Sequence, residues 1–131
     1  MKELTFFPDK RDLTVKLNLQ KGVMVAAYSI ELFEPDGITP ALDPPVMGHN
    51  VDEIDDFLPL PTPIVKNDQR FLLIEFRFEG LDPNFPNYSI EVDILQEEVL
   101  IDRETRTGLL TGEKQGETIM MQFLSQPPVV S

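Results

Sequence analysis

The chain has 131 residues, 23 acidic and 11 basic side chains, a net charge of −12 and no cysteine. Its length suits a single domain over 1–131, and the missing thiols exclude a disulfide framework, a thiolate zinc site and a cysteine nucleophile. The acidic balance would repel phosphates and anionic headgroups, so we expect neither nucleic acid nor a membrane as a partner. No segment reaches the roughly 20 apolar residues of a membrane helix. The start, "MKELTFFPDKRD", has no signal-peptide core, which favours a cytoplasmic location.

The first third of the chain predicts β-strands. A short candidate, "ELTFF", comes first. Residues 13–19 then alternate apolar and polar side chains, which is the period of a half-buried strand. Residues 23–33 predict a longer strand, which the turn signal "PDG" at 35–37 closes. In the strand 13–19 the inward side chains would be Leu13, Val15, Leu17 and Leu19.

Residues 34–69 form a long acidic and proline-rich excursion with no clear strand pattern. A structureless connection of this length is improbable inside a compact domain. We therefore expect a short helix over 51–58, with Asn50 as its N-cap and Glu53 at the capping-box spacing. Pro59 would end that helix, and the prolines at 59, 61 and 63 would then hold the chain extended, across an outer face or along a sheet edge. The apolar stripe of the helix would consist of Val51, Ile54, Phe57 and Leu58.

The second half of the chain predicts further strands. Residues 71–80, 88–94 and 118–123 alternate strongly, and shorter candidates lie near 100 and near 110. The segment "TGEKQGE" reads as a hairpin turn, and residues 125–131 as a tail. The inward positions would be Leu72, Ile74, Phe76, Phe78, Tyr88, Ile90, Val92, Ile94, Ile119, Met121 and Phe123.

Together these segments predict an all-β protein. About seven or eight short strands joined by Pro, Gly and Asn/Asp turns are typical of an antiparallel β-sandwich, Ig-like or jelly-roll-like. Several apolar residues fall on the outward parity of these strands, where a two-layer sandwich favours polar residues. They are Val23, Val25, Ala27, Phe71, Leu73, Met120 and Leu124. Our hypothesis is that the excursion covers part of this outer face, and that the remainder is an oligomer or partner interface.

Two groups of residues could bind a metal ion. His49, the only histidine, precedes Asp52, Glu53 and Asp56, but these acids would point around the predicted helix, so we expect a solvated acidic face instead. In the loop "GLDPNFPNY", the oxygens of Asp82, Asn84 and Asn87 could hold calcium, although the same residues are ordinary turn formers. We assign no metal and no cofactor.

Nothing in the sequence indicates an enzyme. No Gly-x-Ser-x-Gly motif and no phosphate-binding loop occurs, and His49 is the only imidazole available as a base. We therefore assign no catalytic residue. Carbohydrate binding usually needs exposed aromatic rings, and the chain has no Trp. The phenylalanines that could serve instead are Phe33, Phe57 and Phe85.

We expect a non-enzymatic structural or adaptor module that acts through protein–protein contact, as a homo-oligomer or a component of a larger assembly. The expected interaction surface consists of Val25, Leu73, Met120, Leu124, Phe57 and Leu60. The alternative is a ligand-binding sandwich that recognises carbohydrate or calcium through its end loops.

Overall fold

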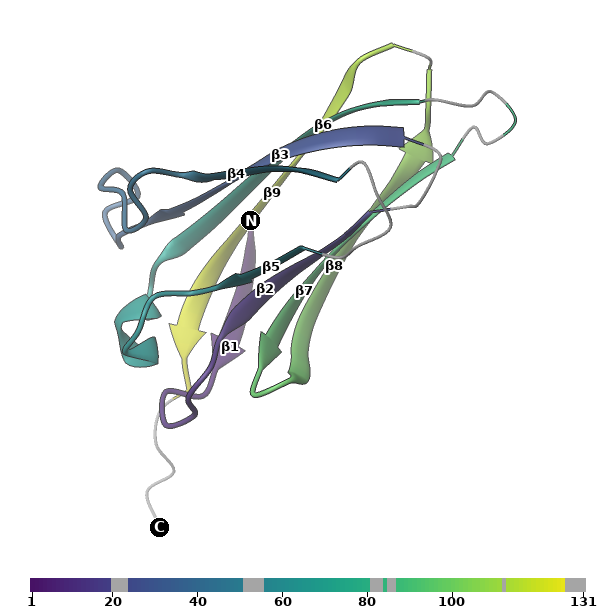
Figure 1. Cartoon of the computed structure of the whole chain (residues 1–131). Helices are drawn as coiled ribbons and strands as arrows, with labels where there is room; N and C mark the ends of the chain where they lie inside the picture. Colours follow the sequence, from purple (N-terminus) through teal and green to yellow (C-terminus); the bar gives the residue numbers. More distant parts are fainter. Residues whose placement is uncertain (20–23, 51–55, 81–83, 85–86, 112, 127–131) are drawn as a thin grey trace.

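The computed structural model describes residues 1–19, 24–50, 56–80, 84, 87–111 and 113–126. Within these residues the chain forms two sheets that pack face to face as a sandwich (Figure 1). The prediction of an all-β sandwich is confirmed. The strands are β1 (Lys2–Phe6), β2 (Thr14–Leu19), β3 (Met24–Phe33), β4 (Val46–Asn50), β5 (Asp56–Pro59), β6 (Phe71–Gly80), β7 (Asn87–Gln96), β8 (Val99–Leu109) and β9 (Gln115–Ser125), and a single 3-10 turn, η1 (Ile64–Asn67), precedes β6.

The five-stranded sheet has the order β1-β9-β6-β3-β4, and the four-stranded sheet the order β5-β2-β7-β8. All neighbouring strands pair antiparallel except β1 and β9, which pair parallel with Leu4 opposite Phe123. The predicted antiparallel sandwich is thus found with one parallel pair at its edge. A parallel pair needs a long crossover, and here almost the whole chain separates the two strands.

The core lies between the sheets, where the predicted inward positions meet. Ile74 of β6 is opposite Ile30 of β3 and Ile119 of β9, and all three are nearly inaccessible to solvent. From the other sheet, Val92 and its neighbours at alternate positions of β7 are equally buried. The period-2 pattern therefore predicted correctly which side chains form the core, because the two faces of a strand alternate along it.

Each sheet has a tyrosine packed over a glycine of the neighbouring strand. Tyr28 is in register with Gly48, and Tyr88 with Gly108. A Cβ atom built on Gly48 would lie 2.4 Å from the Tyr28 hydroxyl, and one on Gly108 would lie 2.6 Å from the Tyr88 hydroxyl. The missing side chain thus makes room for the ring, a cross-strand pairing that stabilises glycine in a sheet. Tyr88 also packs on the Phe78 ring, with centroids 4.6 Å apart.

The predicted helix over 51–58 is wrong where the structure can test it. Residues 56–58 belong to β5, which pairs antiparallel with β2 and places Leu58 opposite Val15; residues 51–55 lie outside the described residues. The capping-box spacing and the apolar stripe are local signals, and tertiary pairing with the edge of the four-stranded sheet overrides them. Pro59 ends β5 at the sheet edge, where its missing N–H breaks no ladder.

The described part of the excursion does not cover an outer face. Its described strands, β4 and β5, extend the two sheets at their edges, one in each sheet (Figure 1). The residues after β5 close one end of the sandwich, where Ile64 is buried and the amide of fully buried Asn67 donates to the carbonyl of Pro61 over 3.0 Å. Arg70 then forms an ion pair with Glu34 at 2.8 Å. The prolines suit these edge positions, as the edge-strand alternative anticipated.

The two short strand candidates near 100 and 110 are one continuous strand, β8. Leu100 pairs with Leu95, and an irregularity in the register follows at Ile94 and Leu95. The register shift explains why the alternation in the sequence breaks near residue 100 although the strand continues. The prediction of a hairpin turn at "TGEKQGE" is wrong: β8 and β9 belong to different sheets, so the chain crosses from one sheet to the other there, and residues 115–117 already lie in β9.

Candidate functional site

The two outer faces of the sandwich differ in how they satisfy their charges. On the four-stranded sheet, the Arg103 guanidinium forms a bidentate ion pair with Asp93, at 2.7 and 3.1 Å. Its second partner is Glu91 at 3.4 Å. The hydrogen bonds that Arg103 donates to Asp93 raise the pKa of Arg103 further above its usual value. Next to this cluster, the Lys16 ammonium lies 5.6 Å from the Phe57 ring centroid. On this face the charged side chains named here already have partners within the chain.

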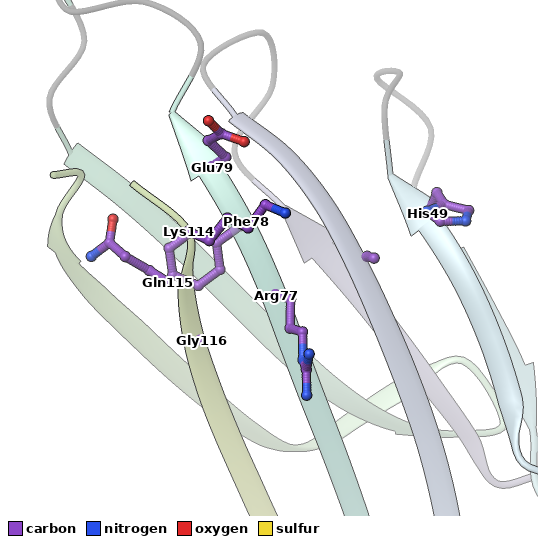
Figure 2. A pocket seen from close by; sticks show the side chains of 8 residues that line it. His49, Arg77, Phe78, Glu79, Lys114, Gln115 and Gly116 are labelled. Carbon is purple, nitrogen blue, oxygen red and sulfur yellow. The ribbon is translucent and has the colours of Figure 1, made fainter. Parts of the chain in front are cut away.

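The outer face of the five-stranded sheet is built differently. One row across four strands contains His49 of β4, Ala27 of β3, Arg77 of β6 and Gly116 of β9, each in register with the next. Large and small residues alternate along this row. The small ones leave a hollow of about 600 Å³, which Phe78, Glu79, Lys114 and Gln115 also line (Figure 2).

A second hollow of about 340 Å³ continues along the same strands. Ala27 and Arg77 line both hollows, and Tyr28, Ser29, Met47 and Glu75 complete the second. We call the two together the β3 groove. Its floor is Ala27 and Ser29 of β3, one wall is Met47 and His49 of β4, and the other wall is Glu75 and Arg77 of β6. The groove exists because two small residues fall on the outward parity between strands with longer side chains.

The cations of the β3 groove lack ion-pair partners. In the described part of the chain, Arg77 and Lys114 form no salt bridge and lie over no aromatic ring. Most other described cations have such a partner. Ion pairs are formed by Lys2, Arg11, Arg70, Arg103 and Arg106, and two lysines, Lys10 and Lys16, lie over phenylalanine rings. The acids of the groove, Glu75 and Glu79, also form no ion pair within the described residues. With 23 acids in the chain, an unpaired arginine beside an unpaired lysine is unusual.

The groove is flanked by exposed apolar side chains. Met47 is 79% exposed and Met120 of β9 is 42% exposed, while Leu73 of β6 and Leu124 of β9 are half-buried. A scattered exposed apolar residue needs no explanation, but methionines beside a hollow give an adaptable contact surface. This face therefore combines apolar contact with charges that have no internal partner.

The predicted interaction residues do not all lie on this surface. Leu73, Met120 and Leu124 share the five-stranded sheet, and Val25 of β3 is in register with Glu79, although its side chain lies outside the described residues. Phe57 is 60% exposed but belongs to the edge of the other sheet. Leu60 is only 4% exposed and packs in the core. Leu60 is therefore corrected from a surface residue to a core residue: its backbone N–H donates to the Leu13 carbonyl, which draws the chain inward.

Only three of the five metal candidates lie in the described part of the chain. His49 is exposed on β4, Asn84 is exposed in the loop before β7, and Asn87 begins β7; Asp52 and Asp82 lie outside the described residues. In the part of the chain that the structure describes, no three His, Asp or Glu side chains are grouped as metal ligands. Of the aromatic candidates for sugar binding, Phe33 is half-buried and Phe85 lies outside the described residues. Calcium and carbohydrate binding stay predictions.

Sequence reasoning missed the residues that shape the β3 groove, namely Ser29, Met47, Arg77, Lys114 and Gly116. One signal was available for Arg77, which is the only base between Arg70 and Arg103. A lone base among acids has many possible partners nearby, so its lack of a partner is visible only in the structure.

Comparison with protein-family models, with curated proteins and with solved structures finds no match for this chain. Among the described residues, no helix has the length and apolar character needed to cross a bilayer.

Proposed function

We propose that this protein is a non-enzymatic protein-binding module whose docking surface is the outer face of its five-stranded sheet. The partner covers the β3 groove and the exposed methionines beside it. The module works as a structural or adaptor component of an assembly, with no chemistry of its own.

The single observation that carries the proposal is the contrast between the two outer faces. The four-stranded sheet pairs Arg103 with Asp93 and Glu91, so a partner there would have to break ion pairs that are already made. The five-stranded sheet offers Arg77, Glu75 and Glu79 without such pairs, next to the exposed Met47. Exposed apolar side chains next to charged groups without an internal ion pair are features of a protein interface.

Site-specific photo-crosslinking tests the proposal. A photoreactive phenylalanine analogue replaces Met47 on the five-stranded sheet, and in a matched protein it replaces Thr105, which is exposed on β8 of the other sheet. Both proteins are irradiated in the cells from which the chain comes, and the adducts are identified by mass spectrometry. We expect one dominant adduct at Met47, with this chain itself or with another protein, and none at Thr105.

The adduct is then checked by affinity. Met47→Glu should weaken binding of the identified protein at least tenfold, because a charge replaces an apolar contact, while Thr105→Glu should leave binding unchanged. An adduct that forms mainly at Thr105, or no adduct above background at Met47, would overturn the proposed docking surface. Light scattering of the purified chain separates self-association from a heterologous complex.

A further inference from the structure

We infer that the β3 groove recognises a carboxylate on a partly apolar segment of the partner protein, with Arg77 as the central contact and Lys114 as a second cation at the same hollow. This inference rests on the proposed function and specifies the chemistry of the partner.

The argument begins with the position of Arg77. It lies in the middle of β6, with Ala27 on one side and Gly116 on the other, so neither neighbour in its row blocks access to its side chain. The backbone is close below Gly116, where an added Cβ would meet the Phe76 carbonyl at 3.2 Å. A side chain of a partner can therefore approach Arg77 from either flank. Figure 2 shows Arg77 extending along the sheet, with His49 of β4 and Lys114, which directly precedes β9, lining the same hollow.

The second step concerns charge. A guanidinium presents donors in a planar fork that matches a carboxylate, and such charge-assisted bonds are among the strongest in proteins. Arg103 is an example within this chain, because its guanidinium binds the carboxylate of Asp93 in a bidentate pair. Arg77 has no equivalent among the described residues, and Lys114 adds a second unpaired cation at the same hollow.

Glu75 and Glu79 lie two residues from Arg77 on either side and on the same face of β6. They reduce the attraction for a free anion in solution, because the groove as a whole is nearly neutral. They favour a ligand that brings its own apolar contacts, so that the ion pair forms in a site from which water is excluded. The exposed Met47 beside the groove supplies the apolar contact. For this reason we choose a peptide segment over a small free acid.

The net charge of −12 opposes the approach of any acidic partner at long range. At physiological salt this repulsion is screened beyond about 8 Å, so contacts within the groove decide the affinity. We therefore expect binding that strengthens as salt rises from low to moderate concentration, which is the reverse of an ordinary surface ion pair.

The experiment titrates the full isotope-labelled chain with capped pentapeptides and follows its NMR spectrum. One peptide has a central glutamate flanked by leucines, and the other has glutamine in its place. We expect the glutamate peptide to shift the backbone amides of Ala27 and Gly116 and the Nε–H of Arg77. The glutamine peptide should bind at least tenfold more weakly, since it lacks the charge.

Two variants with the same change of net charge serve as a matched pair. Arg77→Gln should remove the preference for the glutamate peptide. Lys66→Gln should retain it, because Lys66 is exposed on η1, outside the groove, and has no ion-pair partner among the described residues. Equal loss in both variants would mean a general effect of net charge and would overturn the inference.

Other outcomes identify which claim fails. Acetate is titrated as well. If it shifts the same resonances and binds with the same affinity as the glutamate peptide, the ligand of the hollow is a free carboxylate, and the inference of a peptide segment is overturned. Equal binding of both peptides would overturn the carboxylate contact and leave the docking surface in place, provided that the Met47 crosslink forms. A peptide that binds at the groove while crosslinks form only at Thr105 would overturn the proposed function instead.

Discussion

At the scale of single residues, the most demanding packing is the pairing of tyrosine with glycine across neighbouring strands. Tyr88 fills the space over Gly108, stacks on Phe78 and donates its hydroxyl to Glu117 at 3.1 Å. Burial and this hydrogen bond raise the pKa of Tyr88, so the ring stays neutral in any ordinary buffer. The same arrangement at Tyr28 and Gly48 shows that each sheet uses it once in the described residues.

Gly108→Ala should destabilise the protein by about 1–3 kcal/mol, which is the usual range for overpacking. The new Cβ would lie 2.7 Å from a Tyr88 ring carbon, so the ring must move away from Phe78. Urea denaturation measures the change. In a Tyr88→Ala background the same substitution should cost less than about 0.5 kcal/mol, because the clash is gone. An equal cost in both backgrounds would locate the effect in the backbone.

Residue burial was predictable where a strand alternates and unpredictable where prolines interrupt the pattern. Leu72, Ile74 and Phe76 follow the period of 2 and are buried as expected. Leu60, between two prolines, has no neighbouring pattern to fix its direction, and we had assigned it to the surface. Its burial depends on a hydrogen bond to the carbonyl of Leu13, which is 47 residues away.

At the scale of elements, β1 joins the two sheets along one side of the sandwich. The Lys2 ammonium forms ion pairs with Asp102 and Glu104 of β8 at 3.0 and 3.1 Å. Burial alone would lower the pKa of Lys2, but these two carboxylates raise it above its usual value. After β1, the buried Gln96 amide of β7 accepts from the N–H of Phe7 at 2.8 Å and donates to its carbonyl at 2.7 Å. Side chains thus join elements that share no backbone ladder.

Stability should depend on pH through Glu104, which contacts both Arg106 of its own strand and Lys2 of β1. Hydrogen bonds from Arg106, and then from Lys2, hold the pKa of Glu104 below its ordinary value of 4.5, although burial opposes them. The folded state therefore binds fewer protons than the unfolded state between the two pKa values. The stabilisation is complete above the unfolded pKa and is lost as the pH falls through the folded one.

We expect the free energy of unfolding to fall less steeply below about pH 5 in Glu104→Gln than in the parent chain. Urea titrations at several pH values measure the slope. Glu113→Gln is the control, because Glu113 is exposed and has no ion pair among the described residues. Parallel slopes for the parent chain and Glu104→Gln would show that the contact contributes no acid sensitivity.

The elements that sequence reasoning missed, β4 and β5, are short edge strands. Each pairs with a single neighbour, so half of its backbone needs no ladder partner, and prolines are tolerated there. Their sequences contain too few residues for alternation to be visible. The capping-box signal at Asn50 and Glu53 pointed to a helix because it describes only the nearest residues, whereas the sheet edge is supplied by β2, far away in sequence.

At the scale of the whole molecule, the excess of acids is distributed so that one outer face is internally paired and the other is not. The face around Arg103, whose charges are paired within the chain, offers fewer charged groups that a partner could bind. On the other face Arg77 and Lys114 stay unpaired despite the net charge of −12. This asymmetry is the basis of the proposed function.

The same net charge should make the folded state sensitive to ionic strength. Repulsion between the acids is greatest in the compact state, and about 0.1 M salt reduces the screening distance to about 10 Å. We expect the melting temperature to rise between low and moderate sodium chloride. In a triple variant, Asp9→Asn, Asp12→Asn and Glu113→Gln, the rise should be smaller, since these acids are exposed and have no ion pair in the described residues. A flat response in the parent chain would mean that the acids are already far enough apart.

The sequence by itself determined the all-β class and the inward side of β2, β6, β7 and β9. These follow from a period of two residues, which is a local property of an extended chain. Only the tertiary structure decided the parallel pairing of β1 with β9, the edge strands β4 and β5 within the excursion and the row of His49, Ala27, Arg77 and Gly116. The physical reason is that strand order and register are fixed by contacts between residues far apart in the chain, and a groove across four strands exists only once that register is set.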